Sequence, residues 1–161
     1  MPLIVNIALD GPARGKGRPR ATVRNGHATV YTDDKTVKYE AQLRFAAMQA
    51  MAGRPPTAQP VALLMTVRFA VPVAWSRKKT AAALLGHVRP TVKPDADNTL
   101  KLTDALNGIV WLDDKQVVDA RVRKIYAETP GLLIEVRTIA APVLPEARVG
   151  DRPREAGDLL A

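Results

Sequence analysis

The feature that most constrains the fold is an apolar run near the middle of the chain, Val61 to Val71. Apolar residues follow one another there almost without interruption, which is typical of a buried strand. A chain of 161 residues is long enough for about one domain, since domains commonly contain roughly 100 to 200 residues. We therefore expect one domain, residues 1–140, organised around this strand.

Shorter segments before this run predict further strands. Leu3 to Leu9 is rich in branched residues and ends at the turn signal Asp10-Gly11-Pro12. Asn25-Gly26 then separates Ala21 to Arg24 from Ala28 to Thr32. Because Asn-Gly favours the tight turns that join antiparallel strands, the sequence predicts a β-hairpin here.

Two segments near the end of the chain also have the composition of strands. They are Val117 to Ala127 and Leu132 to Ile139, and they flank the turn-rich link Glu128-Thr129-Pro130-Gly131. Such a link favours direct antiparallel pairing of the two segments it joins. We therefore expect a second hairpin.

A helix is predicted between the first hairpin and the central strand. It begins at Asp33 or Asp34, runs to about Ala52, and ends at Gly53. Five residues recur near helical spacing in it: Val37, Ala41, Arg44, Phe45 and Met48.

A shorter helix, Arg77 to Leu85, is expected after the central strand. Ser76 is suited to cap its start, and Gly86 is suited to end it. Strands and helices thus follow one another in mixed order, without regular βαβ alternation. This order predicts an α+β domain in which helices pack on a mixed β-sheet. The remaining segment, Ala141 to Ala161, is dominated by Pro, Arg, Glu and Gly, and predicts a flexible tail.

Composition narrows the function classes. The formal net charge is +8, from 24 Lys and Arg against 16 Asp and Glu, which favours a polyanionic partner, nucleic acid first and an anionic membrane surface second. The chain has no Cys and two His, which excludes disulfides and leaves oxygen as the expected metal ligand. No apolar run is long enough to span a membrane, and no leader segment is evident, so we expect a soluble, cytoplasmic protein.

One segment of this basic chain is rich in acidic and amide side chains: KPDADNTLKLTDALNGIVWLDD, residues 93–114. Asp95 or Asp97 can cap a helix that runs from about Asn98 to Leu106. Helical geometry places Asp97, Lys101 and Asp104 on one face, and Leu102, Ala105 and Leu106 on the other. The first face is therefore polar, while the second packs against the core.

Asp113 and Asp114 form a second acidic cluster that we expect to fold back beside the first. Converging carboxylates repel one another unless a cation neutralises them, and oxygen ligands select Mg²⁺, with Mn²⁺ as a substitute. A metal held this way on a basic scaffold suggests a nuclease, in which Lys101 would stabilise charge at the phosphate. The alternative is that Asp95 or Asp97 is an ordinary helix cap and that Asp113-Asp114 is a solvated turn.

Three other residues of this region have simpler interpretations. We interpret Asp104 as a surface residue of the helix and Trp111 as a core residue. Asp119 lies two positions before Arg121 in a predicted strand, so we expect the two to pair on one face.

Basic residues gather in two places outside the acidic segment. Five lie within eleven positions of the N-terminal region, and three lie at the start of a predicted helix. The helix dipole disfavours cations at a helix start, so contact with phosphate explains these three better than helix stability does. The residues are Arg14, Lys16, Arg18, Arg20 and Arg24 in the first group, and Arg77, Lys78 and Lys79 in the second. We predict that they bind the DNA backbone, with a solvated basic surface as the alternative.

The acidic segment and the residues around it resemble a known family. KPDADNTLKLTDALNGIVWLDDKQVVDARVRK resembles the core of the RusA family of Holliday junction resolvases, in the form KPDxDNxxKxxxDALNGxxxxDDxQV. The basic stretch KGRPRATVRNGHATVYTDDKTVKYE resembles the N-terminal signature of that family. Together with AWSRKKTAAALLGHVRPTVKPD, the likeness extends over most of Leu3 to Ile139.

The resemblance implies a RusA-like fold and a homodimeric, Mg²⁺-dependent endonuclease that resolves four-way DNA junctions by paired nicks in recombination and repair. Carried over by motif position, the metal-binding catalytic aspartates are Asp95, Asp97 and Asp114, and the catalytic lysine is Lys101. Asn98 and Asp113 match positions that support these ligands. The resemblance further implies a bacterial or phage-encoded protein.

Two other function classes fit parts of the sequence. A branched-DNA binding protein that does not cut would need the basic residues and not the carboxylates. A metal-dependent phosphohydrolase acting on nucleotides would need the carboxylates, but would leave the large positive charge unexplained.

Overall fold

Strand β4 (Val61–Ala70) occupies an inner position of the sheet, as the long apolar run predicts. In this computed structural model, which describes residues 1–17, 20–24 and 26–139, four strands form a mixed sheet in the order β1-β6-β4-β5. The other strands are β1 (Leu3–Asp10), β5 (Val117–Ala127) and β6 (Gly131–Thr138). Strand β4 pairs antiparallel with β6 and parallel with β5, while β6 also pairs antiparallel with β1. The predicted α+β class is confirmed.

Buried and partly exposed residues alternate along β4, whereas the apolar run predicted that every residue would be buried. Val61, Leu63, Met65 and Val67 are buried, whereas the residues between them are only partly covered. Because successive side chains of a strand point to opposite faces, one face of the sheet is packed and the other is half open. The prediction of a strand is correct, but its burial is one-sided.

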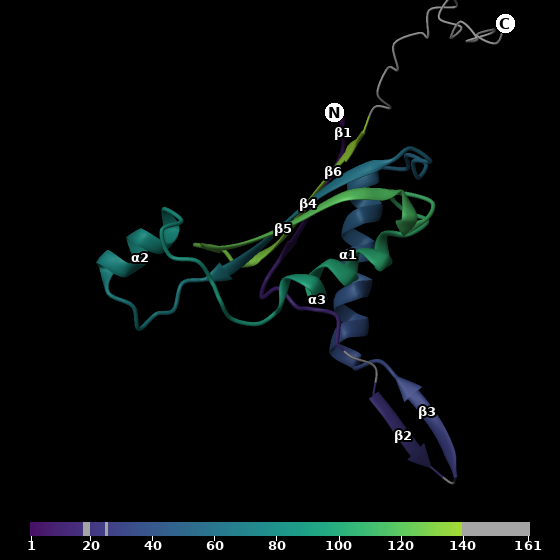
Figure 1. Cartoon of the computed structure of the whole chain (residues 1–161), viewed down its shortest axis with the longest axis horizontal. Helices are drawn as coiled ribbons and strands as arrows, with labels where there is room; N and C mark the ends of the chain where they lie inside the picture. The colour runs from purple at the N-terminus through teal and green to yellow at the C-terminus, as the bar shows by residue number, and fades with distance from the viewer. Residues whose placement is uncertain (18–19, 25, 140–161) are drawn as a thin grey trace, which may run out of the picture.

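Helix α1 (Asp34–Met51) packs with the segment formed by α3 (Ala96–Leu100) and the 3₁₀-helix η1 (Lys101–Leu106), and both build the core with the sheet (Figure 1). The helix ends as predicted near Gly53, with Ala52 already in the left-handed conformation at φ 50°. The core includes side chains from the sheet, from α1 and from the acidic segment, among them Ile7, Leu43, Met65, Leu102, Leu106, Trp111 and Ile134.

The side of α1 that packs is not the one marked by the residues at near-helical spacing. Its buried residues are Thr36, Tyr39, Leu43, Ala47 and Met51. By contrast, Val37, Phe45 and Met48 are 50, 63 and 60 % exposed. The helix carries apolar residues on more than one side, and the side nearest the sheet is the one that is buried.

The first predicted hairpin is confirmed and the second is wrong. Strands β2 (Arg20–Arg24) and β3 (His27–Tyr31) pair antiparallel in a separate ribbon that extends beyond the start of α1 (Figure 1). Strands β5 and β6 do not pair, because β4 lies between them. The link Glu128–Pro130 crosses the end of β4 instead of turning back beside β5.

Helix α2 (Arg77–Leu84) follows the prediction closely. Ser76 Oγ accepts a hydrogen bond from the Lys79 backbone N–H at 3.3 Å, and Gly86 adopts a φ of 82° after the last turn. The predicted tail, Ala141 to Ala161, lies outside the described residues.

Candidate active site

The acidic segment forms a short α-helix, α3 (Ala96–Leu100), that continues as the 3₁₀-helix η1 (Lys101–Leu106). Asp95 is the N-cap residue, but its side chain makes no capping hydrogen bond. The Asp95 carbonyl instead accepts hydrogen bonds from the Thr99 N–H at 3.0 Å and the Thr99 Oγ1 at 2.9 Å. The side chains of both Asp95 and Asp97 are exposed, so their carboxylates are open to solvent.

Lys101 lies one helical turn after Asp97, as predicted. Its Nζ is 3.4 Å from Asp97 Oδ2 and 3.4 Å from Asn98 Oδ1. All of these groups lie on the polar face, while Leu102, Ala105 and Leu106 on the other face are buried. The structure therefore brings Asp97, Asn98 and Lys101 together, and Asp95 lines a hollow with Asn98 at the start of the same helix.

The segment after β1 runs directly alongside this surface. The Lys16 backbone N–H donates to the Asn98 carbonyl at 2.8 Å. Gly15 approaches so closely that an added Cβ would lie 3.0 Å from Asn98 Cβ and 3.1 Å from Pro94 Cβ. A hollow of about 320 Å³ is lined by Gly15, Lys16, Lys93, Pro94, Asp95 and Asn98. Basic and acidic segments distant in sequence thus share one site.

The Lys16 ammonium is already held by two carboxylates. Its Nζ is 2.9 Å from Asp104 Oδ2 and 3.4 Å from Glu40 Oε1. The hydrogen bond to Asp104 raises the pKa of Lys16 above its ordinary value, with partial burial acting in the opposite direction. Lys16 therefore joins the N-terminal segment to η1 and α1, and would have to leave Asp104 to contact a phosphate. Asp104 is exposed, as predicted.

Asp113 and Asp114 stand at a second position, where the short 3₁₀-helix η2 (Asp114–Gln116) leads into β5. Asp113 caps η2 and accepts a hydrogen bond from the Lys115 backbone N–H at 3.1 Å, which lowers the pKa of Asp113. The Gln116 side chain accepts from the Leu112 and Asp113 backbone N–H groups and donates to the carbonyls of Thr57 and Gln59, at 2.9 to 3.0 Å.

The two acidic clusters lie at opposite ends of one helical rod. With 1.5 Å per α-helical residue and 2.0 Å per 3₁₀ residue, α3 and η1 together rise roughly 20 Å from Asp95 to Leu106. Asp114 follows after a further turn, in which Trp111 Nε1 donates to Asn107 Oδ1 at 2.6 Å. In Figure 1 the chain passes along this rod from α3 before it enters β5.

The expected convergence of Asp113 and Asp114 with the first cluster is therefore not seen within one chain. Among the described residues, no three His, Cys, Asp or Glu side chains are close enough together to hold a metal ion. Asp95 and Asp97 are two exposed carboxylates at the start of α3, and Mg²⁺ commonly binds one or two carboxylates and completes its shell with water and substrate phosphate.

The remaining predicted basic residues have different surroundings. Arg77, Lys78 and Lys79 are exposed at the start of α2, where Lys79 Nζ also lies 3.9 Å from the centre of the Trp75 ring. Arg14 is exposed on the segment after β1. Arg18 lies outside the described residues, and for Arg20 and Arg24 only the backbone, in β2, is described.

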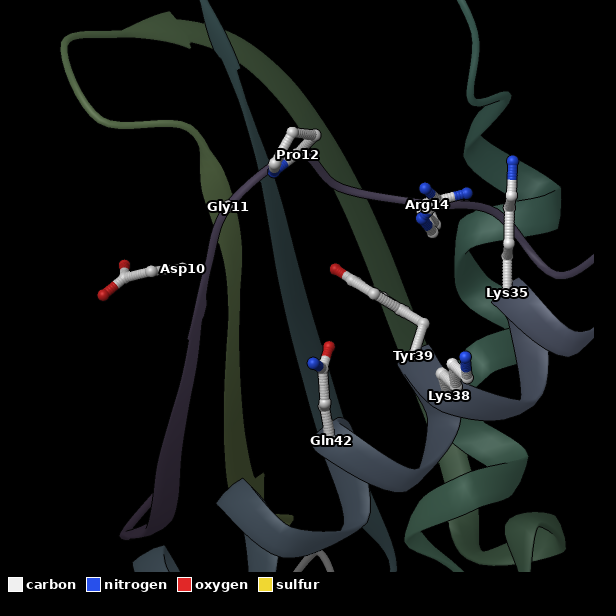
Figure 2. A pocket seen from close by; sticks show the side chains of 8 residues that line it. All are labelled: Asp10, Gly11, Pro12, Arg14, Lys35, Lys38, Tyr39 and Gln42. Carbon is white, nitrogen blue, oxygen red and sulfur yellow. The ribbon is translucent and has the colours of Figure 1, made fainter.

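Sequence reasoning missed a second hollow on the other side of the N-terminal segment. It measures about 290 Å³, and its lining includes Arg14, Lys35, Lys38 and Tyr39 (Figure 2). The signal was the three-residue spacing of Lys35 and Lys38, which places both on one side of the first turns of α1. Two further predictions are confirmed: Trp111 is fully buried, and Arg121 Nε pairs with Asp119 Oδ1 at 3.7 Å.

The fold and this surface define a basic α+β protein that presents carboxylates beside a cationic segment. Comparison with known proteins specifies the class further. The family model described as Endodeoxyribonuclease RusA matches residues 10–137. YqaN of Bacillus subtilis (strain 168), an uncharacterized protein, is 37 % identical over 142 residues, which cover 85 % of this chain and 98 % of YqaN. The chain belongs to the RusA family of endodeoxyribonucleases.

The resemblance noted from the motifs is thereby confirmed. The matched region includes the N-terminal basic segment, α1, the whole acidic segment and most of β6. In the part of the chain that the structure describes, none of the helices has the length and apolar character needed to cross a bilayer.

Proposed function

We propose that the protein is a Mg²⁺-dependent endonuclease that resolves four-way DNA junctions by paired, symmetric nicks, in recombination and repair. Mn²⁺ is expected to substitute for Mg²⁺. The observation that carries this proposal is the hydrogen bond between the Lys16 N–H and the Asn98 carbonyl. It fixes a basic segment beside Asp95 and Asp97, in a chain of the RusA family.

The residues on the polar face of α3 fit the roles that the family motif gives them. The carboxylates of Asp95 and Asp97 would hold the metal, which supplies polarisation of the phosphodiester and an activated water when bound. Lys101, within 3.4 Å of Asp97 and Asn98, is placed to stabilise negative charge that develops on the phosphate. Asn98 holds Lys101 on one side and the basic segment on the other.

In this proposal, Asp114 contributes to the metal site of a second copy of the chain. Its separation from Asp95 along the rod is too large for a shared ion within one chain, because metal–oxygen distances of 2.0 to 2.1 Å bring two ligand oxygens within about 4 Å. In a two-fold dimer the same surface of each chain contacts the other chain, and this arrangement would allow Asp114 of the partner subunit to reach Asp95 and Asp97. A dimer would also supply the two cuts that a junction requires.

A junction-cleavage assay with Mg²⁺ tests the proposed activity. The wild type should nick opposing strands, and Asp97→Asn should lower the rate at least about a hundredfold without loss of folding. Asp119→Asn is the matched control, because Asp119 is a carboxylate on β5 that pairs with Arg121. If the wild type binds the junction but is as inert as Asp97→Asn with several divalent ions, the protein is a binding module instead.

Mixing two inactive variants tests the shared site. Asp97→Asn and Asp114→Asn are each expected to be inactive, but their heterodimer would contain one site with neither substitution. Nicking should then return to about a quarter of the wild-type rate, because half of the dimers are mixed and each has one intact site of two. If each site is complete within one chain, mixing restores nothing.

A further inference from the structure

The hollow on the far side of the N-terminal segment has the properties of an anion site. It lies between the end of β1 and the first turns of α1, and its lining residues are Asp10, Gly11, Pro12, Arg14, Lys35, Lys38, Tyr39 and Gln42. Figure 2 shows Tyr39 and Gln42 extending from α1 toward the segment that carries Gly11, Pro12 and Arg14. Arg14, Lys35 and Lys38 have exposed side chains and form no ion pair within the described part of the chain.

Tyr39 supplies an independent sign that a ligand belongs here. Only 6 % of the residue is exposed, and its Oη is buried with no described group that accepts a hydrogen bond from it. A buried hydroxyl proton without an acceptor is costly, and native proteins satisfy nearly all such groups. Burial raises the pKa of Tyr39, while a hydrogen bond from the Arg14 backbone N–H and the charge of Arg14 act in the opposite direction. The hydroxyl therefore stays protonated and can donate a hydrogen bond to an oxyanion.

The Asp10 carboxylate in the lining repels a bound anion only weakly. Asp10 pairs with Arg68, whose Nη2 is 3.3 Å from Asp10 Oδ1. In Figure 2 the Asp10 carboxylate points away from Arg14, Lys35 and Lys38. The hollow thus combines three cations, one unsatisfied hydroxyl donor and the Gln42 amide with one carboxylate that is already paired.

The position of this hollow relates it to the candidate active site. Arg14 lines it, while Gly15 and Lys16 line the hollow that contains Asp95 and Asn98. The two hollows therefore lie on either side of one short segment. The Cα atoms of Arg14 and Lys16 are at most about 7.6 Å apart, a separation of roughly two nucleotides at about 3.4 Å of axis per nucleotide in one strand.

We propose that Arg14, Lys35, Lys38 and the Tyr39 hydroxyl form a phosphate subsite, which holds a backbone phosphate of the DNA strand about two nucleotides from the phosphodiester at Asp95 and Asp97. This inference rests on the proposed function and names the contacts that position its substrate. A phosphodiester of DNA and a free phosphate share the chemistry that the site recognises, so the experiment includes both.

Junction binding without divalent ions, followed by fluorescence anisotropy, tests the subsite without cleavage. Tyr39→Phe should weaken binding about tenfold, because a hydrogen bond to a charged group is lost. The same variant should melt at or above the wild-type temperature, because it removes an unsatisfied hydroxyl from the free protein. A purely structural tyrosine would show the opposite pair of results.

Charge variants provide a second measurement that does not depend on Tyr39. Lys38→Gln should reduce the slope of log affinity against log salt by about 0.9, the value for one lost phosphate contact. Arg44→Gln is the matched control, since Arg44 is an exposed cation of α1 outside this hollow. It should change affinity less than about twofold, because salt screens a cation that makes no contact.

Each outcome bears on the subsite separately from the nuclease activity. If the wild type cleaves junctions and both Tyr39→Phe and Lys38→Gln bind them normally, the subsite is refuted and the proposed function stands. If wild-type binding is weakened by both variants but no junction is cut, the subsite stands and the proposed function fails. If inorganic phosphate binds through Tyr39, detected by NMR titration, while junction binding is unchanged in both variants, the hollow is a small-anion site and not a DNA subsite.

Discussion

Gly15 is the position at which the basic segment and the acidic helix can be tested as one unit. A Cβ added there would meet Asn98 Cβ at 3.0 Å and Pro94 Cβ at 3.1 Å, whereas carbon atoms in contact prefer about 3.5 to 4.0 Å. The segment must then move by roughly half an ångström or more, which strains the 2.8 Å hydrogen bond from the Lys16 N–H to the Asn98 carbonyl. Overpacking of this kind costs about 1 to 3 kcal/mol, so Gly15→Ala should lower the free energy of unfolding by that amount in a urea titration.

A double-mutant cycle identifies the contact responsible. Asn98→Gly removes the nearer of the two Cβ atoms, and its own helix-propensity cost of about 0.3 to 0.5 kcal/mol is the same in both backgrounds. Gly15→Ala should therefore cost less beside Gly at position 98 than beside Asn98, with a coupling of at least about 0.5 kcal/mol. The reasoning is refuted if Gly15→Ala is within about 0.5 kcal/mol of wild type, or if the two changes are additive.

The surroundings of Asp113 give two further predictions. Gln116→Ala should lower the free energy of unfolding by about 1 to 3 kcal/mol in urea, because four hydrogen bonds between the Gln116 side chain and the backbone are lost. Lys115→Ala, at an exposed residue, should change the free energy of unfolding by less than about 0.5 kcal/mol. The hydrogen bond from the Lys115 backbone lowers the pKa of Asp113 in the folded state. The ionised Asp113 side chain therefore stabilises the fold above the ordinary aspartate pKa, and this stabilisation is lost as the pH falls through the lower folded value. In thermal melts below about pH 4, Asp113→Asn should accordingly lose less stability than the wild type does.

The parts of the fold that were predicted correctly depend on local signals. Ser76 caps α2, Gly26 turns the chain between β2 and β3, and Gly53 ends α1, because each acts on its own backbone neighbours. The polar and apolar faces of α3 and η1 were predictable for the same reason, since the sequence there offers a single apolar stripe.

The two errors in the fold concern partners distant in sequence. The link between β5 and β6 contains turn residues, but the insertion of β4 between these strands depends on pairing with residues more than 50 positions earlier. On α1, Val37 and Phe45 repeat at helical spacing just as Leu43 and Ala47 do, and only the position of the sheet decides which set is buried. Local periodicity predicts a helix but cannot choose between two such sets.

In the candidate site, too, the contacts set by local spacing were predictable and those set by long-range packing were not. Asp97 and Lys101 lie four residues apart in one helical segment, so their spacing alone brings them together. The place of Asp114 depends instead on the turn after Leu106, which no spacing rule fixes. Lys35, Lys38 and Tyr39 were missed because their relation to Arg14 arises only when β1 and α1 pack against each other.

The position of Asp114 bears directly on how the proposed metal-binding carboxylates could be assembled. Gln116 ties this turn to Thr57 and Gln59 through its side chain, and Trp111 is fully buried with its Nε1 bonded to Asn107. Moving Asp114 by the length of the rod within one chain would break these hydrogen bonds and expose a core tryptophan, at a cost of several kcal/mol. Association of two copies leaves all of these contacts intact and needs only an interface. The physical cost therefore favours a site completed by a second chain over one formed by refolding of the first.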